Sequence, residues 1–238
     1  MLEKTEVIVL KATKYGETSL IVKLFSEKFG CIPIILKGIR NGKKNNAGLF
    51  QPGYILELNI YYRENKQLFQ VKDYAVAYNY QSVAQNIGKQ SIVLFIVELL
   101  LNVLREHHAN KEIFYYIKEF ILKLDNEEHR IKAYPLILMY ELSQFLGIEP
   151  LINQSPTQIY FNLEKGSFDT TFDARLCLDI YHSNLFYHFI NSLTTQDQFS
   201  ISANEQQILL DIWLNYYSIH IPEFRTMQTP KILHDILN

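Results

Sequence analysis

A cationic loop between residues 36 and 52 is the first part of the sequence that could do chemistry. Lys37, Arg40, Lys43 and Lys44 fall within eight residues of one another. Glycines and asparagines surround these charges, and both residue types tolerate the left-handed backbone of tight turns. An irregular loop with several cations suits a polyanion, because it can meet several phosphates without one fixed geometry. A solvated surface loop that happens to be basic is the alternative.

Strands must position this loop, because the residues on both sides of it alternate or are β-branched. Such runs occupy residues 7–12, 20–25, 31–36, 54–62 and 68–76. Five short antiparallel strands favour a small closed barrel or an SH3-like barrel, because closure removes exposed edges.

The remainder of the chain has the apolar period of helices. It predicts helices at 92–104, 111–124, 125–145 with a kink or break at Pro135, 173–193, 208–220 and 231–237. Capping-box patterns begin at Asp125 and Ser202, Asp173 is predicted to cap the helix that follows it, and Gly147 is predicted to end a helix. A short β-hairpin is predicted at 159–168. The change of period predicts two domains, 1–80 and 81–238.

The distribution of charge differs between these two parts. Residues 1–80 carry 12 Lys and Arg against 7 Asp and Glu, a net charge of +5, whereas residues 81–238 carry 11 against 18, a net charge of −7. A nucleic acid is therefore expected to contact the N-terminal part.

Several classes of protein are disfavoured. The sequence has no P-loop, dinucleotide-binding, zinc-protease or nucleophile-elbow motif, so we predict no enzyme and no cofactor. Cys31 and Cys177 are far apart in the sequence, which fits a reducing cytoplasm and argues against a zinc site. The charged first residues predict no signal peptide, and the longest apolar run is too short to span a membrane.

Short sequence pieces, in order and at family spacing, make the chain resemble the bacterial recombination mediator RecO family. They are Val9-Leu10, Tyr15-Gly16-Glu17, Ile21-Val22, Leu24-Phe25, Gly30, Lys37-Gly38, Gln51-Pro52, Leu56-Glu57-Leu58 and Phe145-Leu146-Gly147. The C-terminal residues 209–233 also resemble that family's closing helix and tail.

This resemblance implies an α+β protein, with an N-terminal five-stranded OB-fold barrel and an all-α helical domain that holds a small β-hairpin. It implies binding of single- and double-stranded DNA, annealing of complementary strands, and partnership with RecR and single-strand-binding protein, so that RecA is loaded in homologous recombination. It also implies a cytoplasmic, nucleoid-associated protein.

Two departures from the family pattern change the expected sites. Many members carry four cysteines after the leucine–glycine pair, but residues 151–172 here contain none, so a hairpin without zinc is expected. Some members carry arginines that hold the acidic tail of single-strand-binding protein, where this chain has Leu136 and Ile137. Nearby cations could substitute for them: Lys118, Lys123, Arg130 and Lys132.

The leading hypothesis is a DNA-binding mediator without catalytic turnover. Its phosphate contacts would be the four loop cations together with Lys11, Lys14, Lys23 and Arg63. Tyr15, Tyr61, Phe50 or Phe69 could stack on bases, although the two phenylalanines are better explained as barrel core. The alternatives are an adaptor whose barrel binds peptide and a small-molecule hydrolase in the helical domain.

Overall fold

The computed structural model describes residues 1–238 except 42–45, 64–67, 106–107, 130, 196–199 and 238. It divides into two compact units, Met1–Ile131 and Lys132–Asn238. The first unit therefore contains two helices beside the strands. That residues 1–80 form a domain of their own stays a prediction.

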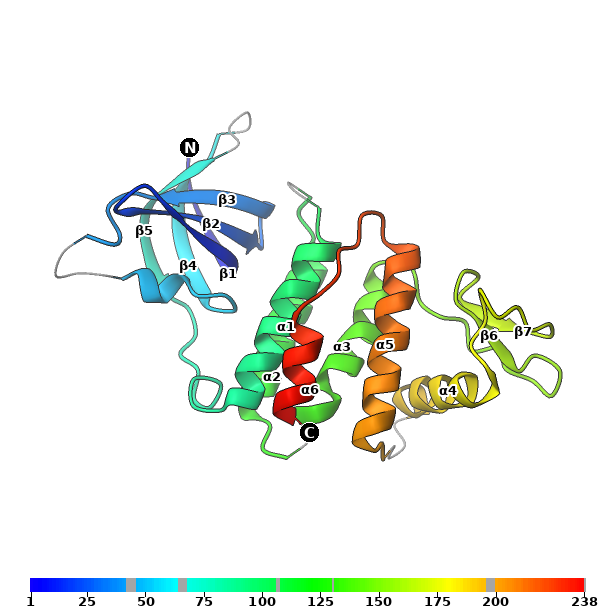
Figure 1. The fold of residues 1–238 in the computed structure, drawn as a ribbon. Helices are drawn as coiled ribbons and strands as arrows, with labels where there is room; N and C mark the ends of the chain where they lie inside the picture. Colours follow the sequence, from blue (N-terminus) through cyan, green and yellow to red (C-terminus); the bar gives the residue numbers. More distant parts are fainter. Residues whose placement is uncertain (42–45, 64–67, 106–107, 130, 196–199, 238) are drawn as a thin grey trace. The chain divides into compact units, whose positions relative to one another are not determined.

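Five strands of the first unit close into a barrel (Figure 1). They are β1 (Leu2–Tyr15), β2 (Ser19–Ser26), β3 (Gly30–Leu36), β4 (Ile55–Tyr61) and β5 (Phe69–Val76). The order around the barrel is β1-β2-β3-β5-β4, with β3 and β5 parallel and all other neighbours antiparallel. The barrel expected from the strand pattern is confirmed, and the OB-fold expected from the resemblance agrees with it.

Period-two alternation explains the barrel core. On β2, Leu20, Val22 and Leu24 point into the core, and the residues between them point outward. Phe50, in the short 3-10 helix η1 (Ala47–Phe50), and Phe69 are also buried there. Their interpretation as core residues is therefore confirmed.

Two helices complete the first unit, α1 (Ile87–Val103) and α2 (Lys111–Asn126). They cover one end of the outer barrel surface. Ile8 and Phe25 lie opposite one another on β1 and β2, and both are fully buried although they point away from the barrel core. The Phe25 ring meets the Phe114 ring of α2 edge to face at 5.5 Å between centroids, and α1 packs against β1.

Asp125 does not open a helix, so the capping box predicted there is wrong. It lies in the last turn of α2 and is 2% exposed. Its carboxylate accepts the backbone N–H groups of Gln81, Ser82 and Val83 at 2.8–2.9 Å and the hydroxyl of Tyr78 at 3.0 Å. Burial raises the pKa of Asp125, but these donors outweigh it and lower the pKa to about 2. The carboxylate thus fastens the segment after the barrel to α2.

The second unit contains four helices and a hairpin. They are α3 (Tyr134–Phe145), β6 (Tyr160–Asn162), β7 (Ser167–Asp169), α4 (Ile180–Thr195), α5 (Ala203–His220) and α6 (Thr229–Leu237). The hairpin and the Ser202 capping box are confirmed. The residue after the α3 cap, Gly147, has a φ of +70°, which fits the predicted helix end.

The kink or break predicted at Pro135 is confirmed as a break, and the helix cap predicted at Asp173 is wrong. Pro135 lies in the first turn of α3, so the predicted helix 125–145 is broken rather than kinked. Asp173 is not a helix cap. Asp179 has that role, because its Oδ1 accepts the backbone N–H of His182 at 2.9 Å at the start of α4. Among the described residues, no helix is long and apolar enough to span a bilayer.

Candidate nucleic-acid interface

The ladder between β1 and β2 places two lysines directly opposite each other. After a register shift between Val9 and Lys11, Lys11 pairs with Lys23. Directly opposite residues share one face and have Cβ atoms about 5 Å apart, and like charges in such a pair are destabilising. Two cations this close together raise the local positive potential, which favours an anion.

The residues around this lysine pair form a surface that we call the open face. Its members project outward from the second half of β1 and from β2 and β3: Lys11, Thr13, Ile21, Lys23, Pro33 and Ile35. All of them are at least partly exposed, and none is acidic. Ile21 and Ile35 are opposite one another, so apolar surface lies beside the cations. The face of β2 and β3 is where OB-folds commonly bind oligonucleotides.

The cationic loop is anchored beside the open face. The backbone N–H of Arg40 donates to the Thr18 carbonyl at 3.0 Å, and its guanidinium Nη1 donates to the Gly16 carbonyl at 3.3 Å. Ile39 is 8% exposed and belongs to the barrel core. These contacts fix the start of the loop on the β1–β2 turn, next to Tyr15. Lys43 and Lys44 lie outside the described residues.

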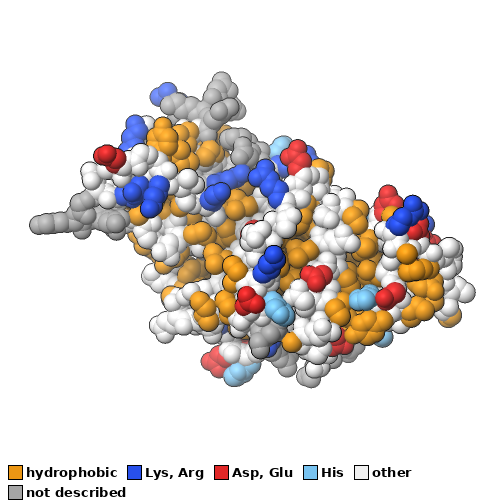
Figure 2. Space-filling view, viewed as in Figure 1, with side chains coloured by type: hydrophobic (Ala, Val, Ile, Leu, Met, Phe, Trp, Pro, Cys, Tyr) orange, Lys and Arg blue, Asp and Glu red, His pale blue; other side chains and the backbone are white. Residues whose placement is uncertain are grey.

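Most cations of this region have no internal partner. Lys11, Lys14 and Lys37 are exposed and form no hydrogen bond or ion pair with any residue that the structure describes. Figure 2 shows Lys and Arg side chains gathered over the barrel, whereas both signs of charge mix over the helices. The resulting positive potential attracts phosphates.

Three lysines elsewhere on the first unit are compensated by acids. We call these residues the paired region: Glu3, Lys4, Glu6, Lys28, Glu57 and Lys118. Nζ···O distances are 2.8 Å for Lys4–Glu57, 3.5 Å for Lys28–Glu3 and 2.8 Å for Lys118–Glu6. Lys118, predicted to contact a partner, is thus held on β1 by a half-buried ion pair.

The structure describes two of the other three cations predicted to contact a partner. Lys123 is exposed on α2, and Lys132 is exposed just before α3. Arg130 lies outside the described residues. Leu136 is buried and Ile137 partly exposed. A site for the tail of single-strand-binding protein therefore stays a prediction.

Two of the four aromatic candidates can stack on a base. Tyr15 and Tyr61 are 56% and 48% exposed. Phe50 and Phe69 have no accessible ring face, because both are in the core. Tyr61 lies at the end of β4 close to Arg63, and the two residues line a hollow of about 220 Å³ together with Met1 and Gln70.

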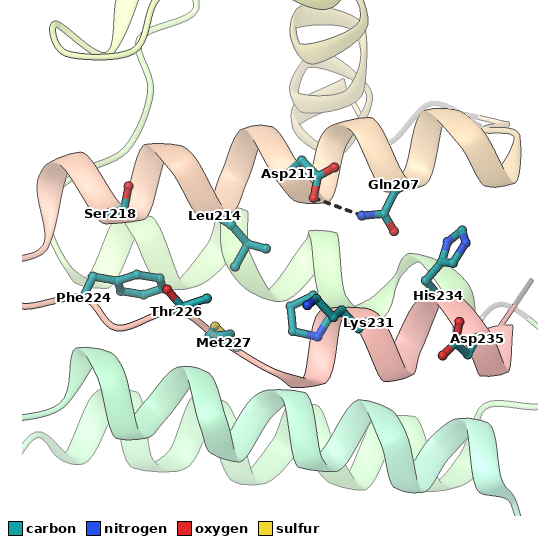
Figure 3. A pocket seen from close by; sticks show the side chains of 11 residues that line it. Gln207, Asp211, Leu214, Ser218, Phe224, Thr226, Met227, Lys231, His234 and Asp235 are labelled. Atoms are coloured by element: carbon teal, nitrogen blue, oxygen red, sulfur yellow. Dashed lines mark hydrogen bonds between the residues drawn. The ribbon is translucent and has the colours of Figure 1, made fainter.

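The second unit has a larger pocket of about 630 Å³ between α5 and the segment that leads into α6 (Figure 3). Leu214, Phe224 and Met227 make its apolar part. Ser218 and His234 lie toward opposite ends, so they form no nucleophile–base pair. No group of three His, Cys, Asp or Glu side chains among the described residues could hold a metal ion.

The comparisons with known proteins agree with the OB-fold barrel. Residues 1–80 match the family described as recombination protein O, N-terminal, and residues 84–156 match recombination protein O, C-terminal. A DNA repair protein RecO of Flavobacterium psychrophilum is 31% identical over 238 residues, which cover 99% of each chain. The chain belongs to the RecO family of DNA repair proteins.

Other RecO proteins are similar along their whole length. Those of Christiangramia forsetii and Bacteroides fragilis are each 28% identical, covering 99% and 100% of each chain. RecO proteins are repair mediators, not enzymes, and the family resemblance read from the short sequence pieces is confirmed. The N-terminal match covers the barrel and therefore the open face.

Sequence reasoning named Lys11 and Lys23 but missed that they are opposite each other. The signal was available in part, because both lysines belong to strands joined by a short turn at Gly16. Counting back from Tyr15 and Ser19, the pair that closes the turn, places Lys11 opposite Lys23, because the register shift lies beyond this pair, between Val9 and Lys11.

Proposed function

We propose that the open face and the cationic loop bind the phosphates of single- and double-stranded DNA. The observation that carries this proposal is the lysine pair Lys11–Lys23 on a face without acids. Lysine–phosphate contacts carry no base information, so binding is expected to be independent of sequence. The same surface continues over Lys14, Tyr15, Lys37 and Arg40. Lys43 and Lys44, outside the described residues, are predicted to add contacts, and Arg63 adds a contact beyond the end of β4.

The same charges suit strand annealing. Two complementary strands repel each other through their phosphates, and a cationic surface that neutralises both strands lowers this barrier. With RecR, the protein would help load RecA onto DNA coated by single-strand-binding protein, acting in the cytoplasm at the nucleoid. Membership of the RecO family supports these roles.

The test compares two double variants that lose the same charge. Lys11→Ala/Lys23→Ala removes the lysines of the open face, and Lys4→Ala/Lys28→Ala removes two lysines of the paired region. The first variant should bind a labelled oligonucleotide about tenfold more weakly, with a log–log salt slope reduced by roughly 0.7 per lost contact for a single strand. The second should bind like the wild type. Equal effects of the two variants would refute a specific open face.

A further inference from the structure

A row of outward side chains leads from the open face to the hollow at the end of β4. The ladders pair Ile21 with Ile35, Ile35 with Gln70, and Gln70 with Tyr61. Neighbouring strands are about 4.8 Å apart, so the row from β2 to β4 is about 14 Å long, a distance that a few nucleotides span. A strand whose phosphates lie on Lys11 and Lys23 can therefore reach the hollow.

The residues that line the hollow suit a nucleobase. Tyr61 offers a ring face that is 48% exposed. The Gln70 amide can donate to and accept from a base edge, and the Arg63 guanidinium can hold a phosphate or stack. Arg63 forms no hydrogen bond or ion pair within the described part of the chain, and none of the described residues that line the hollow is an acid.

The backbone beside Tyr61 is held firmly. The Tyr62 ring stacks between Phe29, at 4.2 Å, and Phe69, at 5.2 Å between centroids. The Tyr62 N–H also donates to the Met1 carbonyl at 3.0 Å, which continues the β1–β4 ladder. A preorganised site loses less conformational entropy when a ligand binds.

We propose that the hollow bounded by Tyr61, Arg63 and Gln70 receives an unpaired base of a single strand bound on the open face. This inference rests on the proposed function. Bases of a duplex are paired and stacked on both sides, and one can enter the hollow only if it flips out. The hollow therefore adds affinity for single strands and none for duplex DNA, whereas the lysines serve both.

The experiment uses the full chain, a single-stranded oligonucleotide that contains 2-aminopurine, and a duplex of the same length. Tyr61→Leu keeps the apolar bulk but removes the ring. It should weaken single-strand binding about tenfold, leave duplex binding unchanged, and reduce the fluorescence quenching seen when the wild type binds. Tyr181→Leu, at a tyrosine of α4 that is 54% exposed, is the matched control and should change neither affinity.

The outcomes separate this inference from the proposed function. If Lys11→Ala/Lys23→Ala weakens binding of both DNAs while Tyr61→Leu weakens neither, or weakens both equally, the base site is refuted and the phosphate-binding face stands. If the lysine variant binds normally but Tyr61→Leu loses single-strand affinity, the base site stands and the open face fails. If the wild type binds neither DNA, both are refuted. Gln70→Ala, at an exposed residue that lines the hollow, repeats the test should Tyr61→Leu not fold, and should also weaken only single-strand binding.

Discussion

The open face and most of the paired region lie on the same barrel, but the charged neighbours of their lysines differ. In the paired region each lysine has a carboxylate within 3.5 Å, and Lys118 of α2 even reaches Glu6 of β1. On the open face Lys11 lies directly opposite Lys23. The first arrangement contributes to stability, whereas Lys11 is exposed and has no hydrogen bond or ion pair among the described residues.

The covering helices account for much of this difference. Ile8 and Phe25 are buried because α1 and α2 pack over them, and α2 also brings Lys118 to Glu6. Farther along the same two strands, Ile21 and Lys23 stay partly exposed. One strand pair thus forms a packing surface at one end and the proposed binding surface at the other.

The largest effect on stability is expected where the covering helices are fastened to the barrel. Asp125→Ala leaves the backbone N–H groups of residues 81–83 without their acceptor. The free energy of unfolding should fall by about 3 kcal/mol, measured by urea denaturation. The DNA affinity of the folded fraction should not change, because Asp125 lies on α2, outside the open face, and binds the segment after the barrel. A large loss of DNA affinity in fully folded Asp125→Ala protein would contradict the separation between the contacts of Asp125 and the open face.

The same residue makes stability depend on pH in a defined window. The folded pKa of Asp125, about 2, lies below its ordinary value of 3.8. Its contribution is therefore complete above about pH 4 and is lost as the pH falls toward about 2. Asp125→Asn should show a flatter decline over this window than the wild type. Parallel declines would contradict the prediction.

Removing the loop cations should produce the largest effect on binding. Replacing Lys37, Arg40, Lys43 and Lys44 by Ala should weaken oligonucleotide binding on the order of 100-fold at low salt, for all sequences alike. The melting temperature should barely move, since exposed charges contribute little to stability. A quadruple variant with wild-type affinity and salt dependence would show that the loop is only a solvated surface.

The half-buried ion pair of the paired region should affect stability alone. Lys118→Met leaves Glu6 without its partner and should lower the free energy of unfolding by about 1 kcal/mol. Its affinity for DNA, measured by fluorescence anisotropy, should equal that of the wild type. A clear loss of affinity would place Lys118 in the interface.

The smallest expected change in stability gives the sharpest test of the comparison between the open face and the paired region. Lys11→Thr removes the like-charge repulsion with Lys23 and keeps a residue that favours strands. The protein should become more stable by about 0.5 kcal/mol while its affinity for DNA falls. Lys4→Thr, which breaks a pair with Glu57, should show the opposite sign for stability and no change in affinity. Destabilisation by Lys11→Thr would mean that the lysine pair is compensated.

Local patterns were sufficient for most of the fold. Alternation along β2 and β4 and the capping box at Ser202 depend on neighbours within a few residues, so they are visible in the sequence. The errors at Asp125 and Asp173 have different origins. Asp125 binds residues 81–83, which are far away along the chain, whereas Asp173 binds the neighbouring Arg175 in a turn before α4.

The sequence by itself determined the strands and helices, the family, the separation of charge between the N-terminal part and the rest, and the cationic loop. Only the tertiary structure decided which lysines are compensated. Lys118 contacts Glu6, which lies 112 residues away along the chain, and Lys4 of β1 contacts Glu57 of β4. Charge is a property of each residue, but its compensation depends on distance, and folding sets the distances between residues far apart in the chain.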